Sequence, residues 1–234
     1  MSEEKTGREL LLPGDEIEEG DVKPGRGTFK RDGKIYAAKL GVKTFRSGYV
    51  NVAAQSGRYE PKDGDKVIGT VVDVNSSIWM VDINAPFPAV LHVNDVPWNV
   101  DYGDTSSYID VGDAILVRVS KVDELKKTQL RMDEEGLRIL NSGQIIEIAP
   151  SQVPRVIGRK GSMISLLKKY SNCRIFVGQN GRIWLDGDLE GQYIAVKAIQ
   201  MIEEKAQVVG LTDAVKNYLK SKTNKDFDDE ESSD

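Results

Sequence analysis

The sequence predicts a multidomain protein that combines β and α/β parts: a small N-terminal all-β domain, a five-stranded barrel, and a domain of order β-α-α-β-β-α. Three observations support this. The 234 residues exceed what one small barrel needs. The 22 glycines and 8 prolines favour short strands joined by turns. Beyond about residue 134, apolar residues recur at helical spacing as well as in strand-like runs.

Residues 10–62 predict the small all-β domain, preceded by a flexible segment at residues 1–9. Leu10–Leu12 and the stretch Tyr49–Val52 have strand composition, and Arg31-Asp32-Gly33 predicts a hairpin turn. Basic and aromatic residues are interleaved in this segment, which suits a docking surface for protein or RNA but also an ordinary solvated sheet face. They are Lys23, Arg26, Phe29, Lys30, Arg31, Lys34, Tyr36, Lys39, Lys43, Phe45 and Arg46.

Residues 63–133 predict a closed barrel of the OB type, because five β-rich stretches occur within about 70 residues. The stretches are Val67–Val74, Ile78–Ile83, Ala89–Val93, Ala114–Val119 and Thr128–Met132. The connection from Asn94 to Val111 is long enough to act as a functional loop or to cover one barrel end. Its Trp98 and Tyr102 could stack on bases, but packing over the barrel is the preferred interpretation.

Residues 134–220 predict the α/β domain. A short helical piece through Leu140 precedes a strand at Gln144–Ile148, two short helices joined by Gly158-Arg159-Lys160-Gly161, and a hairpin whose turn contains Asn180-Gly181. A long helix through Ala195–Ala206 and a last short helix follow. Residues 221–234 are acidic and aperiodic, which predicts a disordered tail.

Charge and composition exclude several functions. The net charge is −5, yet residues 1–62, 63–133, 134–220 and 221–234 carry +2, −6, +3 and −4, so both segments flanking the barrel are mildly basic. No apolar run is long enough to span a membrane, and no signal peptide precedes the first domain, which predicts a cytoplasmic protein. One Cys and one His predict no structural zinc, no other metal or cofactor, and no catalytic triad.

The glycine loop is the sharpest motif. Gly158 and Gly161 let the backbone approach a nucleic-acid strand closely, while Arg159, Lys160 and helix N-terminal amides face its phosphates. With Ile157 before it and the β-α-α-β-β-α order around it, the segment resembles a KH domain of the eukaryotic type. The alternatives are a helix-helix turn with two solvated cations and, less favoured, a nucleotide-binding loop, whose G-x-x-x-x-G-K-[ST] pattern is absent.

The middle segment resembles the OB-fold RNA-binding repeat named after ribosomal protein S-one. His92 matches the histidine that ends strand three of that family, and Asp123 and Lys127 fall where its polar pair lies. In place of its strand-two glycine-phenylalanine pair stands Trp79 or Met80, and alternation does not decide which faces outward. The resemblance implies that these residues contact single-stranded RNA, with a structural role for His92 as the alternative.

The three segments together, with Tyr59-Glu60-Pro61 and Asn180-Gly181-Arg182-Ile183-Trp184, resemble the RNA-binding cap subunits of the archaeal exosome, of the type that lacks a zinc ribbon. The resemblance implies a non-catalytic subunit, three copies of which sit on a ring of RNase-PH-like subunits. It would recruit single-stranded, A-rich RNA 3′ ends and guide them into a phosphorolytic chamber.

We expect residues 10–62 to provide the anchor to the ring, because they contain no recognisable RNA motif. Two other interpretations stay open at this level. One is a translation or ribosome-associated factor built from the same RNA modules. The other is a structural adaptor whose RNA motifs have lost their function.

Overall fold

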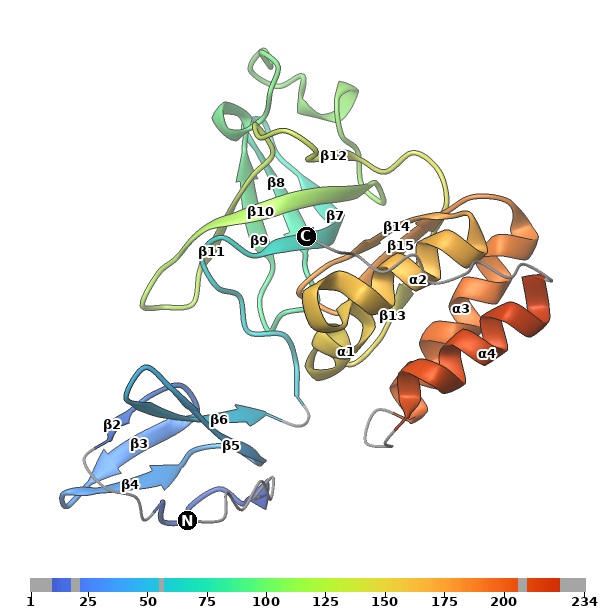
Figure 1. Ribbon diagram of the computed structural model, residues 1–234. Coiled ribbons are helices and arrows are strands. Elements are labelled where there is room, and N and C mark those ends of the chain that lie inside the picture. The colour runs from blue at the N-terminus through green and yellow to red at the C-terminus, as the bar shows by residue number, and fades with distance from the viewer. Residues whose placement is uncertain (1–9, 18–21, 55–56, 206–209, 224–234) are drawn as a thin grey trace. The chain divides into compact units, whose positions relative to one another are not determined.

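The computed structural model describes residues 10–17, 22–54, 57–205 and 210–223, and it forms two units, residues 1–57 and 58–234 (Figure 1). The predicted flexible segment 1–9 and the tail beyond Thr223 lie outside the described residues. The first unit ends before residue 62, where the sequence had placed its boundary, because Tyr59 is buried in the core of the barrel that follows. Its hydroxyl donates to the Asp65 carboxylate at 2.6 Å.

The N-terminal unit is a small β structure with two antiparallel hairpins, one at Asp32-Gly33 and one at Ser47-Gly48. Asp32 and Gly33 both have positive φ, 50° and 82°, as a tight hairpin turn requires, so the predicted turn is confirmed. Buried Leu11, Ile35 and Val50 belong to its core. A four-stranded sheet has the order β1-β5-β6-β2, and β3 pairs with β4. The strands are β1 Leu10–Leu11, β2 Lys23–Pro24, β3 Thr28–Arg31, β4 Lys34–Ala37, β5 Gly41–Arg46 and β6 Tyr49–Ala54.

The barrel of the second unit closes in the order β7-β8-β9-β11-β10, because β10 pairs with both β7 and β11. Val81 and Leu91 are fully buried and alternate with less buried neighbours, as the strand period requires, whereas Val67 and Val117 are fully buried beside Ile68 and Leu116, which are buried as well. All five predicted strands are present. They are β7 Lys66–Val74, β8 Ile78–Asp82, β9 Ala89–His92, β10 Ala114–Val122 and β11 Thr128–Arg131.

The helical piece predicted before Leu140 is wrong. Arg138–Ile139 form a short strand, β12, which pairs with β10 in the register Ile115↔Ile139. The partner strand β11 pairs with β10 only from Arg118 onward, so the first half of β10 offers free backbone groups that β12 takes up. The barrel sheet therefore extends past residue 133, where the sequence had ended it.

The long connection between β9 and β10 covers one barrel end through two 3₁₀ turns, η1 Val93–Asp95 and η2 Thr105–Ser107. Trp98 packs against the barrel core and stacks on Tyr108, with ring centroids 5.9 Å apart. Packing was the correct interpretation for Trp98. It was wrong for Tyr102, which is 88% exposed.

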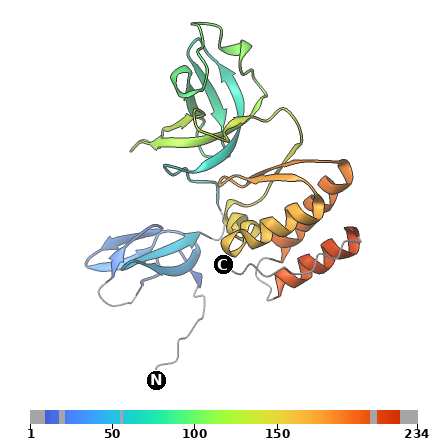
Figure 2. The same ribbon diagram turned by 45° about the horizontal axis from the view of Figure 1, so that its top comes forward.

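The third domain has the β-α-α-β-β-α order, and its antiparallel sheet has the strand order β13-β15-β14. The helices gather on one side of this sheet (Figure 2) and bury a core that includes Leu167, Ile183 and Ile199. A further helix follows. The elements are β13 Gln144–Glu147, η3 Pro150–Gln152, α1 Val153–Ile157, η4 Arg159–Gly161, α2 Ser162–Ser171, β14 Arg174–Val177, β15 Arg182–Asp186, α3 Leu189–Glu204 and α4 Leu211–Thr223.

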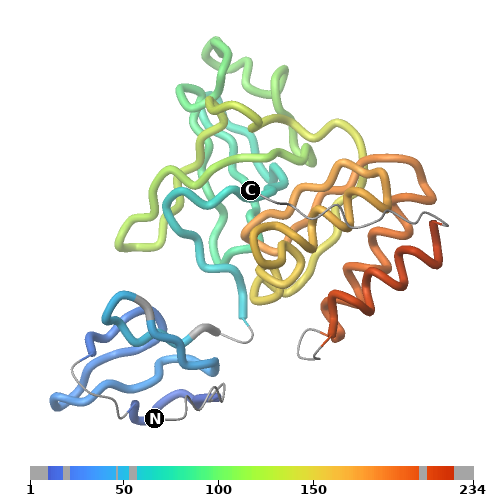
Figure 3. Tube along the Cα trace, viewed as in Figure 1, coloured from blue at the N-terminus to red at the C-terminus, as the bar shows by residue number. Residues whose placement is uncertain are grey.

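The turn between β14 and β15 joins this domain to the barrel (Figure 3). Asn180 is fully buried; its Nδ2 donates to the carbonyls of Ile68 and Ile83 at 2.7 and 3.0 Å, and its Oδ1 accepts from the Ile68 N–H at 3.4 Å. The Gln179 N–H donates to the Lys66 carbonyl at 3.0 Å. Because β8 pairs with β7 only from Thr70 onward, the side-chain amide of Asn180 replaces a missing strand there.

Two further side chains hold the same junction. Buried Arg182 donates to the Asp82 carbonyl at 2.7 Å and to the carboxylates of Asp82 and Glu147. Burial disfavours its charge, but these hydrogen bonds raise the pKa of Arg182 above its ordinary value. Trp184 of β15 lies in the barrel's core cluster rather than in that of its own domain. The third domain thus keeps its own core but contributes Trp184 to the core of the barrel.

We predict that Asn180→Ala destabilises the second unit and loosens its two domains. The substitution leaves the buried N–H and C=O of Ile68 without their partner, and each such group costs about 1 to 3 kcal/mol. Urea unfolding of the full chain measures the loss. Gln179→Ala is the matched control, because the Gln179 side chain is exposed and only its backbone N–H contacts the barrel. Equal stability of the two variants would contradict the prediction.

Candidate nucleic-acid interface

The glycine loop between α1 and α2 depends on glycine at its first position. Gly158 has φ 77° and ψ 174°, and a Cβ there would lie 2.7 Å from both N and Cβ of Met163. Gly161 has φ 81° but faces open space, with its nearest neighbour 3.9 Å from a Cβ. Lys160 between them is also left-handed, at φ 51°. The backbone therefore makes a sharp turn with two cationic side chains at its tip.

Arg159 and Lys160 are exposed, and among the described residues neither takes part in an ion pair. The ten-residue helix α2 starts directly after this turn, so its first backbone N–H groups and its dipole face the same side as the cations. Ile157 is partly buried and packs against the domain core, which anchors the loop. The predicted loop residues thus lie together in an arrangement suited to a phosphate backbone.

The barrel corrects one predicted residue. Trp79 is fully buried in the barrel core, and its indole N–H donates to the Ile109 carbonyl at 2.9 Å. It cannot stack on a base in this structure, so the prediction that it contacts RNA is wrong. Met80 is the outward-facing neighbour, because successive strand residues point to opposite faces.

Strand register places Met80 in a row of outward side chains. Residues opposite each other in paired strands share a face. Met80 pairs with Asp73 on one side and Val90 on the other. Val90 pairs with Gln129, and Gln129 with Lys121, so one row crosses β7, β8, β9, β11 and β10. His92 lies on the same face, opposite Ile78. Met80 and Val90 form a short apolar stripe, with a carboxylate, an amide, a cation and a histidine at its margin, and such a stripe can accept an unstacked base.

The remaining predicted barrel residues have local structural roles as well. The Nδ1 atom of His92 accepts from the Asn94 N–H at 3.1 Å and caps η1, which leaves Nε2 as its free ring nitrogen. The Asp123 carboxylate accepts from the Lys127 N–H at 2.7 Å and shapes the turn between β10 and β11. The Lys127 side chain is exposed at that turn. The structure therefore does not place Asp123 and Lys127 in the Met80 row.

Gln129 and Lys121 were missed by sequence reasoning. The signal that could have found them is the inward position of Trp79, which fixes Met80 as outward and, through strand pairing, the rest of the row. Tracing the row from Met80 to Gln129 also requires knowing that β9 pairs with β11 in parallel. These strands are distant in sequence, so no local pattern shows that they pair.

In the described part of the chain, no group of three or more His, Cys, Asp or Glu side chains is placed to hold a metal ion. No described helix is both long and apolar enough to cross a membrane. Burial raises the pKa of the Cys173 thiol, so its reactive thiolate is disfavoured.

The folds and the two surfaces define a multidomain protein with an OB-type barrel and a KH domain. Family models agree: the KH domain matches residues 143–190, the Rrp4 S1 (S-one) domain matches residues 58–103, and a region described as the exosome complex exonuclease RRP4 N-terminal region matches residues 10–45.

Comparison with individual proteins shows which family the whole chain resembles. The exosome complex component Rrp4 of Picrophilus torridus is 42% identical over 212 residues, 91% of this chain and 92% of that protein. The Methanosarcina mazei protein of the same name is 42% identical over 219 residues, 94% and 84% of the two chains. A crystal structure of a candidate exosome complex RNA-binding protein has 40% identity and a TM-score of 0.66, covering 72% of this chain and 98% of that one. The chain belongs to the Rrp4 family of exosome components.

We predict that Gly158→Ala destabilises the KH domain more than Gly161→Ala. At Gly161 an alanine must adopt a left-handed conformation, which costs about 1 to 2 kcal/mol. At Gly158 the pair φ 77°, ψ 174° lies in a region that is essentially open to glycine alone, and the added Cβ also collides with Met163. Thermal unfolding followed by circular dichroism compares the two variants with the parent chain. If Gly161→Ala proved the more damaging, the geometry described for the loop would be incorrect.

Proposed function

We propose that the chain is a non-catalytic RNA-binding cap subunit of an archaeal exosome. In this proposal it recruits single-stranded RNA 3′ ends, A-rich ones included, and guides them into a phosphorolytic ring of RNase-PH-like subunits in the cytoplasm. The observation that carries the proposal is the pairing, in one Rrp4-family chain, of an intact KH glycine loop with an outward barrel stripe around Met80.

The two surfaces suit different parts of a nucleotide. The exposed cations Arg159 and Lys160 attract phosphates without regard to sequence. The Met80 row and His92 offer an apolar and aromatic surface to base faces. Two weak contacts on one chain, repeated in a trimeric cap, would give avidity without sequence stringency. Such binding suits a subunit that feeds many RNAs to one ring.

The chain's own residues favour a positioning role over a catalytic one. The sequence has one histidine, and the Nδ1 atom of that residue, His92, already caps η1. The sequence also has one cysteine, Cys173, which is buried. We therefore assign bond cleavage to the ring subunits and RNA capture to this chain.

The N-terminal unit is the proposed anchor to the ring. Phe29 stacks on Tyr36 at a centroid distance of 5.5 Å and is exposed, and Lys43 lies over the ring of exposed Phe45 at 5.9 Å. Exposed aromatic and basic side chains on a small rigid sheet are typical of protein-binding surfaces. This part of the chain also contains the match to the RRP4 N-terminal region.

We predict that Arg159→Asp combined with Lys160→Asp weakens RNA binding and leaves the fold intact. Each neutralised phosphate on a single strand contributes about 0.7 to the slope of log affinity against log salt, so losing two contacts flattens the slope by roughly 1.4. Fluorescence anisotropy with oligo(A) at several salt concentrations measures the slope. Unchanged affinity and slope in a folded double variant would show that the loop is only a helix-helix turn with solvated cations.

We predict that deleting residues 1–57 abolishes assembly with RNase-PH-like subunits, because it removes the proposed anchor at the boundary between the two units. Co-elution of tagged full-length and shortened chains from native archaeal extract tests this, with oligo(A) binding by the shortened chain as the control for folding. Capture of ribosomal subunits instead of ring subunits by the full chain would favour a translation factor.

A further inference from the structure

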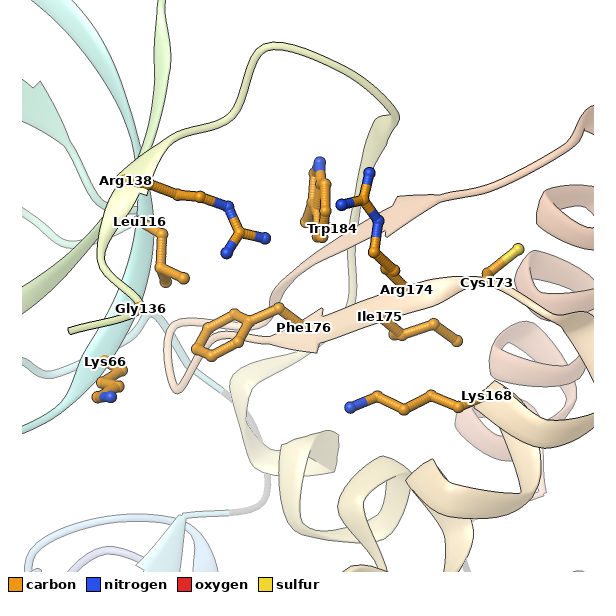
Figure 4. A pocket seen from close by; sticks show the side chains of 10 residues that line it. All are labelled: Lys66, Leu116, Gly136, Arg138, Lys168, Cys173, Arg174, Ile175, Phe176 and Trp184. Atoms are coloured by element: carbon orange, nitrogen blue, oxygen red, sulfur yellow. The ribbon is translucent and has the colours of Figure 1, made fainter.

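A hollow of about 420 Å³ lies between the barrel and the KH domain (Figure 4). Its rim carries Lys66 of β7, Arg138 of β12, Lys168 of α2 and Arg174 of β14. None of the residues that line it is acidic. The charged side chains around the hollow are therefore all cationic, and they come from two domains that the Asn180 turn holds together.

The cations at this rim are largely free to meet an anion. Within the described part of the chain, Lys66, Arg138 and Lys168 have no carboxylate within ion-pair distance. Arg174 contacts the Asp186 carboxylate, yet its side chain remains 72% exposed. Cations that line one hollow without a carboxylate among them repel one another, and an anion bound there relieves that repulsion. The arrangement therefore favours a bound anion.

Trp184 orients the two arginines. The Arg138 and Arg174 guanidinium carbons lie 5.1 and 5.6 Å from its ring centroid, and Figure 4 shows the indole between the two groups. The indole N–H donates to the Ser142 carbonyl at 2.6 Å, which fixes the ring. A guanidinium stacked on a ring keeps its in-plane N–H groups available, and these match phosphate oxygens in a bidentate way.

The position of the hollow indicates what kind of anion enters it. Helix α2 starts at the glycine loop with Ser162 and reaches Lys168 six residues later, about 9 Å along its axis. The hollow is also larger than a single phosphate and has a buried apolar floor at Leu116 and Ile175. A polyanion held at the loop and running along α2 would reach it.

We propose that this hollow is a second phosphate-binding site for the single-stranded RNA held at the glycine loop, with Lys66, Arg138, Lys168 and Arg174 as its ligands. The inference rests on the proposed RNA-binding function and adds a contact that neither the KH loop nor the barrel stripe contains. It makes the junction between the two domains part of the RNA path.

The test compares two charge-matched double variants of the full chain. Lys66→Gln with Lys168→Gln removes two cations from the hollow. Lys197→Gln with Lys205→Gln removes two from α3 and its C-terminal end, outside the hollow. Anisotropy with fluorescent oligo(A) across salt concentrations should show the slope flattened by roughly 1.4, hence about 25-fold weaker binding at 0.1 M salt, for the first variant only. Circular dichroism melting checks that both variants fold.

Arg138→Lys and Arg138→Gln refine the assignment. Lysine keeps the positive charge of Arg138 but lacks the paired N–H donors of the guanidinium group. The Arg138→Lys variant should therefore bind RNA more tightly than Arg138→Gln and less tightly than the parent chain. Photocrosslinking of 4-thiouridine-labelled RNA should mark the peptide that contains β14. The proposal would be overturned if the folded Lys66→Gln/Lys168→Gln and Lys197→Gln/Lys205→Gln variants had the same RNA affinity and the same salt slope. It would also be overturned if RNA crosslinks never included β14.

Two other outcomes separate the possible sources of the anion. Inorganic phosphate or ADP could bind the parent chain and fail to bind the Lys66→Gln/Lys168→Gln variant while the two chains bind RNA with equal affinity. In that case the hollow is a site for free anions, and the proposal is wrong. If the parent chain binds no oligo(A) at all, the proposed RNA-binding function itself fails. If RNA binding is weaker in the Arg159→Asp/Lys160→Asp variant but unchanged in the Lys66→Gln/Lys168→Gln variant, the proposed RNA-binding function stands and only the second phosphate site is ruled out.

Discussion

The side-chain amide of Asn180 is the contact on which the second unit depends. It supplies both the acceptor and the donor that Ile68 lacks where β8 no longer pairs with β7. A buried backbone group without a partner is costly, so the turn must stay against the barrel wall. With that turn fixed, Trp184 enters the barrel core and Arg182 reaches Asp82. The relative position of the glycine loop and the barrel stripe depends on this junction, in which Asn180 is the central contact.

The proposed function gives an acidic barrel a surface for RNA, and its local charges are compatible with that role. Residues 63–133 carry a net charge of −6, but the row through Met80, Val90, Gln129 and Lys121 contains one cation, and its only carboxylate is that of Asp73 at the β7 end. Repulsion between exposed charges is screened beyond about 10 Å at ordinary salt, so contact with bases depends on the local row more than on the total. The basic KH domain supplies the long-range attraction.

Sequence reasoning found the five barrel strands, the KH element order and the glycine loop, because each leaves a local signal in alternation, periodicity or turn composition. It failed where long-range pairing decides. Trp79 and Met80 are adjacent, and only the packed barrel shows that the tryptophan is inside. Arg138–Ile139 form a strand because the first half of β10 is not paired with β11 and can pair with them instead. No local sequence pattern reveals this unpaired edge. Asn180 was recognised as a turn residue, but its use as a substitute strand required the barrel beside it.

The packing of the KH domain on the barrel also limits how these modules can be recombined. Leu137, Ile139, Ile145, Phe176 and Trp184 all lie beyond the last barrel strand in sequence, yet they pack on the barrel's apolar interior or flank. A gene fragment that ended at residue 133 would encode a barrel with an open apolar side. Shuffling the barrel alone into another chain would therefore bring an aggregation hazard with it. Inheritance of the barrel and KH domain as a single cassette is the arrangement that this packing favours.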